Sequence, residues 1–330
     1  MNLLTKKPAI LVARAIFPET LERLAEHFEL ETNQDDVIFT PQELAAKLHG
    51  KQGLLCTGSG RIDAPLLAQT PSLKMVANMA VGYDNIDLAA CTLHQVMASN
   101  TPDVLNQTTA DFAWALLMAT ARRITEAEHY LRAGKWDKWS YDAFLGADLH
   151  GATLGILGMG RIGQAIARRS IGFEMQVLYH NRSRLSPEQE SYANHAQYVS
   201  KQELLTRADH LILILPYSAS THHAIGPAEL DLMQPTATLV NVARGGIVDD
   251  AALIAALRQK KIAAAGLDVF EGEPKLNPDF LTLENVVLTP HIASASAATR
   301  RAMANCAADN LIAALTNQQP PNLLNPAVSV

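Results

Sequence analysis

Short apolar runs alternate with helical patterns along the whole chain. In the first third, these runs cover residues 9–13, 53–57, 74–77 and 95–98. A second series covers residues 153–157, 175–179, 211–215, 238–242, 263–269 and 286–289. Strand-like runs that alternate with helices are typical of parallel sheets covered by helices. The pattern therefore predicts an α/β protein with two doubly wound parallel-sheet domains.

Two long helical patterns stand out from the others. Thr101 and Pro102 have the residue types of an N-cap and a first helical position, and the nearly all-apolar segment 109–122 follows them. A helix that is apolar on all sides must be buried. Together with Trp136 to Trp139 it offers more apolar surface than one subunit covers, which predicts a homodimer. The last pattern, 294–315, follows the final strand and is expected to return to the first domain.

Composition narrows the class of protein and its partners. The 330 residues are 48% hydrophobic, 18% charged and 5% aromatic, as in a globular protein of two domains. The net charge of -6 repels nucleic-acid phosphates and anionic membranes, so neither is an expected partner. Cys56, Cys91 and Cys306 fit no disulfide framework or zinc spacing, so we expect reduced thiols and no metal site. The opening segment 1–8 lacks a secretory signal and no apolar run is long enough to span a bilayer, which predicts a cytoplasmic protein.

The strand pattern at 153–157 runs directly into a glycine-rich motif, Gly158-Met-Gly160-Arg-Ile-Gly163, where the helical pattern 161–171 begins. G-x-G-x-x-G between a strand and a helix is typical of a dinucleotide site. Its glycines permit a tight turn and let the pyrophosphate approach the backbone, while the helix N-terminus holds the anion. A turn that serves only packing is the alternative interpretation.

This motif sets the expected domain division. We expect a Rossmann-like dinucleotide-binding domain at residues 101–290. The remaining segments, 1–100 and 291–330, are expected to form a flavodoxin-like substrate-binding (lid) domain. That domain is discontinuous because the last helix returns to it.

The residues that follow the next strand indicate which dinucleotide is bound. NAD-binding proteins usually place a carboxylate there for the ribose 2′-hydroxyl, whereas this chain has Asn181, with Arg182 and Arg184 beside it. A 2′-phosphate would meet no repulsive carboxylate and two guanidinium groups that can donate charge-assisted hydrogen bonds. The sequence therefore favours NADP(H), with NAD(H) as the weaker alternative. Two solvated surface arginines would leave the same pattern.

Three polar segments end strands of the second series, and they contain Arg244, Glu273 and His291. Ligands of α/β sheets bind at the carboxyl ends of the strands. An arginine, a carboxylate and a histidine gathered there can clamp a substrate carboxylate, polarise a carbonyl and donate a proton. These are the steps that reduction of a 2-keto acid requires.

Taken together, the motifs resemble those of the D-isomer-specific 2-hydroxyacid dehydrogenase family, and within it the glyoxylate/hydroxypyruvate and 2-ketogluconate reductases. The resemblance covers nearly the whole chain. The motifs that carry it are Val81-Gly82-Tyr-Asp-Asn-Ile-Asp87, Thr101-Pro-Asp-Val-Leu, the Gly158 motif, Arg244-Gly-Gly and Pro290-His291.

The resemblance implies roles for individual residues. Arg244 would bind the carboxylate and carbonyl oxygen of the substrate, and His291 would donate or accept the proton. Glu273 would hold His291 and favour its charged form. The backbone amides of Val81 and Gly82 would bind the substrate carboxylate. Asp268 would contact the nicotinamide amide. The residues implied to contact the cofactor are Gly158, Gly160, Arg161, Ile162, Gly163, Leu215, Val242, Ala243 and Asp268.

The implied activity is NADPH-dependent reduction of small 2-keto acids (glyoxylate, hydroxypyruvate and 2-ketogluconate) to D-2-hydroxy acids. An NAD-dependent dehydrogenase of the 3-phosphoglycerate or D-lactate type is the alternative within the family. A dinucleotide-sensing corepressor that binds peptides is the alternative from another class. In the reductase branch a tryptophan near Trp136 or Trp139 reaches the partner subunit's active site, so Trp139 is either a substrate-binding residue or part of ordinary interface packing.

Overall fold

The computed structural model describes residues 7–328, which divide into two compact units. Unit 1 comprises residues 7–105 and 296–328, and unit 2 comprises residues 106–295. The expectation that the chain has no secretory signal concerns residues 1–8. Of these, residues 1–6 lie outside the described residues. Within residues 7–328, no helix combines the length and the apolar character needed to cross a membrane.

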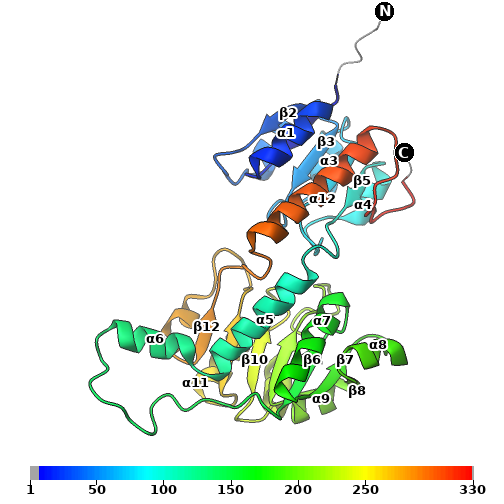
Figure 1. The fold of residues 1–330 in the computed structure, drawn as a ribbon. Coiled ribbons are helices and arrows are strands. Elements are labelled where there is room, and N and C mark those ends of the chain that lie inside the picture. The colour runs from blue at the N-terminus through cyan, green and yellow to red at the C-terminus, as the bar shows by residue number, and fades with distance from the viewer. Residues whose placement is uncertain (1–6, 329–330) are drawn as a thin grey trace, which may run out of the picture. The chain divides into compact units, whose positions relative to one another are not determined.

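Unit 1 is built on five parallel strands in the order β2-β1-β3-β4-β5, the order of a flavodoxin-like sheet (Figure 1). The strands are β1 Ala9–Val12, β2 Glu29–Thr32, β3 Gly53–Cys56, β4 Met75–Asn78 and β5 Met97–Ser99. The helices are α1 Pro18–His27, α2 Pro41–Leu48, α3 Ala64–Gln69, α4 Leu88–Leu93 and α12 Ala297–Leu315.

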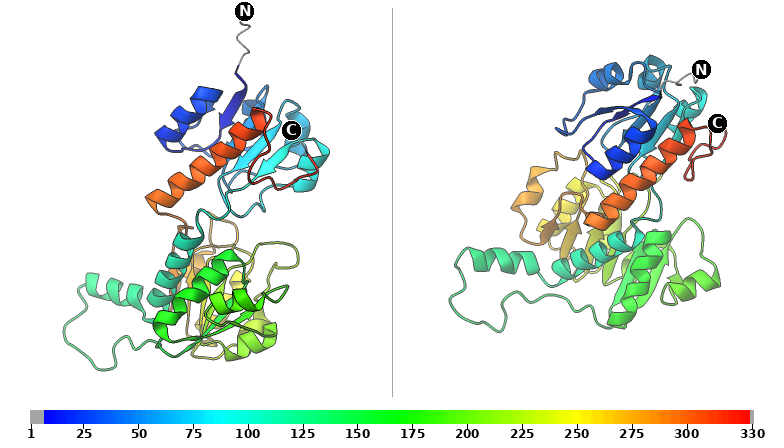
Figure 2. Two further views of the ribbon diagram at one scale, coloured as in Figure 1. Left: turned by 45° about the vertical axis from the view of Figure 1, so that its right-hand side comes forward. Right: turned by 45° about the horizontal axis from the view of Figure 1, so that its top comes forward.

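Helix α12 comes from the far end of the chain and packs on β3 and β4 of unit 1 (Figure 2). It begins after Ser296, whose side chain accepts a hydrogen bond from the Thr299 amide. The helix lies so close to the sheet that a Cβ atom on Gly53 would come within 2.9 Å of both Leu311 and Leu315. The packing of these two leucines makes unit 1 discontinuous in sequence.

Unit 2 is built on seven parallel strands in the order β12-β11-β10-β9-β6-β7-β8 (Figure 1). Chain order reverses between β6 and β9, as in a Rossmann fold. The strands are β6 Thr153–Leu157, β7 Gln176–His180, β8 Gln197–Tyr198, β9 His210–Leu213, β10 Thr238–Asn241, β11 Ala264–Leu267 and β12 Val286–Leu288. The α-helices are α5 Asn106–Ala121, α6 Ile124–Arg132, α7 Arg161–Arg169, α8 Pro187–Tyr192, α9 Lys201–Arg207, α10 Pro227–Leu232 and α11 Asp250–Arg258. Two 3₁₀ helices cover Ser170–Phe173 and Pro278–Thr282.

The apolar helix α5 is buried within its own unit. It packs on α7 and on β10, β11 and β12. Trp114 stacks on Phe173 and donates a hydrogen bond to the Ile166 carbonyl (3.0 Å). A Cβ atom on Gly266 would clash with Thr120 Oγ1 of α5. The expectation that this helix needs a second subunit to cover it is therefore wrong, because the sheet of unit 2 already does so.

The segment that follows α5 exposes apolar side chains. Figure 1 shows α6 and the loop after it extending away from the seven-stranded sheet, and we call residues 124–148 the apolar arm. Its exposed large apolar side chains are Ile124, Leu131, Trp136, Trp139, Tyr141 and Leu145. Unlike α5, the arm leaves apolar surface available for a partner.

Helix α5 begins at Asn106, so the prediction of an N-cap at Thr101 and a first helical position at Pro102 is wrong. The Thr101 amide instead donates to the Ala80 carbonyl of unit 1 (2.9 Å). Asp103 has a φ of 69°, in the left-handed region, which a right-handed helix cannot contain.

Both crossings between the units lie five residues later than the sequence suggested, at 105/106 and 295/296. The second crossing is late because the amide groups of Ile292 and Ala293 are hydrogen-bonded to Asp268 of unit 2. His291, which the sequence placed in the expected lid domain, therefore belongs to unit 2.

The close packing of α5 on β11 gives a test of the fold. We expect Gly266→Ala to lower the free energy of unfolding by about 1–3 kcal/mol, because the added methyl group overpacks the contact with Thr120 and Leu116. Urea denaturation of each purified variant measures the change. Gly172→Ala is the matched control, because its Cβ atom would meet nothing within 4 Å, and a comparable loss there would contradict the account.

Candidate active site

The glycine motif lies at the carboxyl end of β6, where the chain order of the unit 2 sheet reverses. Gly158 has a φ of 100°, and a Cβ atom on it would clash with the Ile214 carbonyl. A Cβ atom on Gly163 would in turn clash with the Gly158 carbonyl. At Gly160, the N-cap of α7, a Cβ atom would meet nothing within 4 Å. The turn is thus tightly packed on one side and open at the helix N-terminus, as a pyrophosphate requires.

The other residues implied to line the cofactor lie near the same edge of the sheet. Arg161 and Ile162 form the first turn of α7, with Arg161 exposed and Ile162 half-buried. Leu215 follows β9 and is half-buried, whereas Val242 and Ala243 follow β10 and are buried. Since parallel strands end at a common edge, these residues border the space beside the glycine turn.

The loop after β7 differs from the expectation in one respect. Arg184 donates two hydrogen bonds to the carboxylate of Glu190 (2.8 and 3.0 Å), and Tyr179 donates a third (2.8 Å). The hydrogen bonds from Arg184 are the main reason that the pKa of Glu190 is lowered. Asn181 donates to the Ser183 carbonyl (3.2 Å). Of the two arginines in this loop, Arg182 has no hydrogen bond or ion pair to the described residues, so its guanidinium is uncommitted.

The turn that carries Arg244 is fixed by its neighbours. Asn241, buried at the end of β10, accepts a hydrogen bond from the Ala243 amide (3.0 Å) and donates one to the Arg244 carbonyl (3.1 Å). A Cβ atom on Gly245 would overlap the Phe270 carbonyl, so this turn lies directly against the segment before Glu273. Only glycine fits at that position.

His291 and Glu273 form a hydrogen-bonded pair. Nδ1 of His291 lies 2.8 Å from Oε2 of Glu273, whose other oxygen accepts a hydrogen bond from the Phe270 amide (2.9 Å). Burial alone would raise the pKa of Glu273, but the hydrogen bond and charge of His291, the Phe270 amide and the charge of Arg244 together lower it. The carboxylate is therefore charged near neutral pH, and Nε2 of His291 is the ring nitrogen left for another partner.

The carboxylate of Asp268 anchors the loop that presents His291. Its oxygens accept hydrogen bonds from the Thr289 hydroxyl (2.8 Å) and from the amides of Ile292 (2.8 Å) and Ala293 (2.9 Å). The side chain is completely buried, and burial raises its pKa against the effect of these hydrogen bonds. Within this arrangement Asp268 holds the loop, while its contact with a nicotinamide amide stays a prediction.

The remaining predicted substrate residues lie elsewhere. Val81 and Gly82 belong to unit 1, where their carbonyls accept hydrogen bonds from the side chains of Asn100 (2.8 Å) and Asn78 (3.0 Å). Their amides donate no hydrogen bond to the described part of the chain, which suits them to bind a carboxylate. Trp139 lies on the apolar arm of unit 2 and is 79% exposed.

Sequence reasoning missed two features of this edge of unit 2. One is Glu190, whose pairing with Arg184 has no sequence signal beyond the adjacent capping box at Ser186. The other is a group of three possible metal ligands, His222, His223 and Glu271. Glu271 is 48 residues from His223 in the chain, so no local spacing motif joins it to the two histidines.

Comparisons with known proteins identify a family and relatives to which this chain is similar. Residues 114–293 match the family model described as "D-isomer specific 2-hydroxyacid dehydrogenase, NAD binding domain". Glyoxylate reductase of Thermococcus onnurineus is 47% identical over 323 residues, which cover 97% of this chain and 96% of that protein. Glyoxylate reductase of Aeropyrum pernix is 46% identical over 327 residues, which cover 97% and 96%. The crystal structure of an NADPH-dependent glyoxylate/hydroxypyruvate reductase of Sinorhizobium meliloti with NADP and malonate is similar with a TM-score of 0.88, at 37% identity and 98% coverage of each chain.

Proposed function

Because the chain belongs to the D-isomer-specific 2-hydroxyacid dehydrogenase family, we propose that it reduces small 2-keto acids to D-2-hydroxy acids with NADPH. Glyoxylate and hydroxypyruvate are the proposed substrates, and 2-ketogluconate is a further one. The two glyoxylate reductases support glyoxylate, and the NADPH-dependent reductase of Sinorhizobium meliloti supports hydroxypyruvate and NADP. Residues 106–295 form the proposed dinucleotide-binding domain, and residues 7–105 with 296–328 the proposed substrate-binding domain.

One observation carries the proposal: His291 is hydrogen-bonded to Glu273 in the part of unit 2 where Arg244 exerts its charge on the same carboxylate. Reduction of a 2-keto acid needs a proton for the carbonyl oxygen and a cation for the carboxylate. A histidine held by a carboxylate supplies the first, and an arginine supplies the second. The three residues come from the turns that follow β10, β11 and β12.

The bound nicotinamide would supply the hydride, and the residues of this chain would do the rest. Glu273 holds Nδ1 of His291, so Nε2 is the nitrogen that gives its proton to the carbonyl oxygen during reduction and removes it during oxidation. The carboxylate of Glu273 favours the charged imidazolium that reduction needs. Arg244 pairs with the substrate carboxylate and stabilises the charge that develops on the carbonyl oxygen. The backbone amides of Val81 and Gly82 in unit 1 stay proposed donors to a substrate carboxylate.

NADP(H) is the proposed cofactor because the loop after β7 carries Asn181 and an uncommitted Arg182. The turn formed by Gly158, Gly160 and Gly163 fits the pyrophosphate of either dinucleotide. Only the residues beside the ribose distinguish the 2′-phosphate from the 2′-hydroxyl. NAD(H) remains the proposed weaker alternative.

We further propose a homodimer formed through the apolar arm, residues 124–148. Six large apolar side chains exposed on one segment are unusual for a monomer, and aromatic residues are enriched at interfaces. The contact of Trp139 with a neighbouring active site is part of this proposal.

We expect His291→Ala to lower kcat for glyoxylate reduction by about 10² to 10⁴-fold, the usual effect of losing a general acid. NADPH affinity, measured by fluorescence titration, should change little. Glu273→Gln should be milder and should shift the pH profile. Glu273→Gln removes a negative charge that stabilises the imidazolium, the form of His291 that donates the proton in reduction. The alkaline limb of the kcat profile for reduction should then move to lower pH.

Arg244→Ala serves as the comparison for this pair. It should raise KM and lower kcat together, since the guanidinium is assigned to both the carboxylate and the carbonyl oxygen. Near-normal turnover of His291→Ala alongside an inactive Arg244→Ala would mean that the proton comes from another group.

Because Arg184 is hydrogen-bonded to Glu190 and Arg182 is not bonded, we expect the two arginines after β7 to differ in their effect on cofactor preference. Arg182→Ala should reduce the preference for NADPH over NADH about tenfold or more, because a charged hydrogen bond is worth about 1.5–3 kcal/mol. Arg184→Ala should change it much less, because its guanidinium is already bonded to a carboxylate. Values of kcat/KM for both cofactors measure the preference. A larger effect at Arg184 than at Arg182 would show that the pair opens when the cofactor binds.

Light scattering tests the dimer. The unmutated protein should have the mass of a dimer at micromolar concentration, whereas replacing both Trp136 and Trp139 by Ser should give monomers. Buried aromatic anchors contribute about 2 kcal/mol or more each, so dimer affinity should fall by about three orders of magnitude. Leu93→Ser is the control, since Leu93 is as exposed as Trp139 (79%) but lies in unit 1. A monomeric unmutated protein would rule out the arm as an interface.

A further inference from the structure

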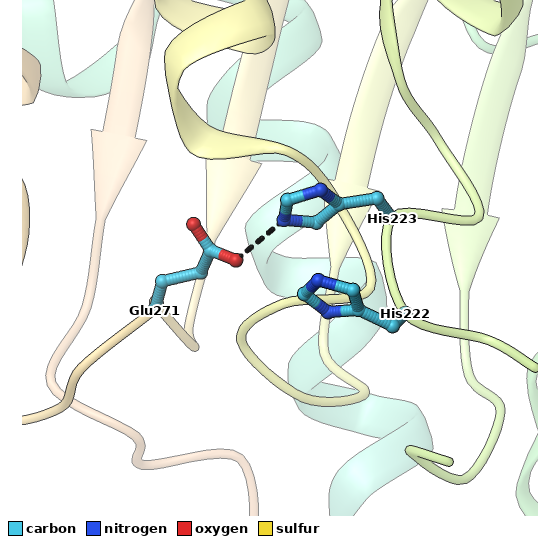
Figure 3. A group of neighbouring side chains, drawn as sticks. All are labelled: His222, His223 and Glu271. Carbon is cyan, nitrogen blue, oxygen red and sulfur yellow. Dashed lines mark hydrogen bonds and ion pairs between the residues drawn. The ribbon is translucent and has the colours of Figure 1, made fainter. Parts of the chain in front are cut away.

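A second cluster of reactive side chains lies on the loops that follow β9 and β11 of unit 2. His222 and His223 come from the first loop, and Glu271 comes from the second (Figure 3). One possible ligand atom from each residue lies within 4.8 Å of the others. None of the three residues has a role in the proposed hydride transfer.

The cluster is already drawn together in the structure. Nε2 of His223 lies 2.6 Å from Oε1 of Glu271, and the rings of His222 and His223 stack with centroids 3.8 Å apart. Figure 3 shows both rings on the same side of the loop, facing Glu271. A metal ion would therefore require only small movements of these side chains.

The backbone holds the two loops in this arrangement. The His223 amide donates to the Gly246 carbonyl (2.7 Å), and the Ile225 amide donates to the Ile247 carbonyl (3.0 Å). The Glu271 amide donates to the buried carboxylate of Asp250 (3.2 Å). The ligand atoms are thus presented by anchored segments, which reduces the entropic cost of binding.

Gly246 keeps space open beside the cluster. It has a φ of 75°, and a Cβ atom on it would lie 3.5 Å from Oε1 of Glu271 and 3.6 Å from Nδ1 of His222. The same position lies 3.0 Å from Cε2 of Tyr217, so the Tyr217 ring borders this space. The Tyr217 hydroxyl is 3.2 Å from Nδ1 of His222.

Two imidazole nitrogens and one carboxylate oxygen form the donor set of zinc sites that keep an open fourth position. Calcium and magnesium prefer sets made only of oxygen, so they suit this cluster poorly. Asp249 adds a supporting feature, because its carboxylate lies 3.9 Å from Nδ1 of His223, the ring nitrogen turned away from Glu271. A carboxylate behind a ligating histidine is the usual outer partner in metal sites.

We propose that His222, His223 and Glu271 bind one divalent transition-metal ion of the zinc type. The ion takes the place of the proton between His223 and Glu271, and water completes its coordination. Binding ties the loop after β9 to the loop after β11 across the Gly246 turn. The bound state of unit 2 is therefore more stable than the free state, by an amount that rises with metal concentration.

Calorimetric titration of the full-length protein, freed of metal with a chelator, tests the proposal with ZnCl₂ alone. We expect one equivalent of zinc to bind and the melting temperature to rise with zinc concentration. His222→Ala, His223→Ala and Glu271→Gln should each weaken binding by about tenfold or more. Glu271→Gln keeps a hydrogen-bond acceptor for His223, so it separates loss of a ligand from loss of folding. Cobalt bound in place of zinc should give a visible spectrum of low coordination number that His222→Ala abolishes.

His150→Ala is the matched control, because His150 pairs with Glu174 (3.5 Å) but belongs to no group of three possible ligands among residues 7–328. It should bind zinc as the unmutated protein does. The proposal is overturned if no zinc binds, or if His222→Ala and Glu271→Gln bind it with unchanged affinity. It is also overturned if His291→Ala abolishes binding while His222→Ala retains it, because zinc would then occupy the His291–Glu273 pair. None of these outcomes depends on whether the protein reduces keto acids.

Discussion

The geometry of the candidate active site depends on the hydrogen bonds that the buried carboxylate of Asp268 accepts. Asp268 directly follows β11, and its two oxygens accept hydrogen bonds from the Thr289 hydroxyl and from the amides of Ile292 and Ala293. Each amide left without this partner would cost about 1–3 kcal/mol in a buried setting. His291 sits inside the loop so held, with its φ of 53° in the left-handed region that few residues other than glycine adopt. The anchor therefore sustains a strained backbone and directs the imidazole towards Glu273.

Close backbone packing imposes the second constraint, and it acts through glycine. At Gly158, Gly163 and Gly245 a Cβ atom would clash with a backbone carbonyl. Gly158 brings the glycine turn against the end of β9, Gly163 brings α7 against that turn, and Gly245 brings the Arg244 turn against the segment before Glu273. These closely packed turns follow strands of one parallel sheet. They therefore lie at the same edge of the sheet and can contribute to one site. The carboxyl edge of unit 2 thus combines an open helix N-terminus, an arginine and a histidine–carboxylate pair.

The central strands, the glycine turn and the family could be predicted because they depend on apolar runs and local motifs. The sequence pattern did not predict the edge strands Glu29–Thr32 and Gln197–Tyr198, because they are short and partly exposed and so lack an apolar run. The start of α5 was misplaced because the Thr101 amide is hydrogen-bonded to the Ala80 carbonyl within unit 1, a contact that no local pattern reveals. The pairing of Arg184 with Glu190 and the His222–His223–Glu271 cluster were missed for the same reason: both join side chains that only the fold brings together.

The most direct test of this account is the kinetics of Asp268→Asn with glyoxylate and NADPH. An amide cannot accept hydrogen bonds on both sides, so its NH₂ group must face either the Ile292 or the Ala293 amide, and the loop should loosen. We expect kcat to fall by about 10-fold or more, because misplacing a catalytic group by about 1 Å can cost 10²-fold, and the dissociation constant for NADPH should change by a smaller factor than kcat. An unchanged kcat with much weaker NADPH binding would contradict the account, because Asp268 would then hold the cofactor and not the His291 loop.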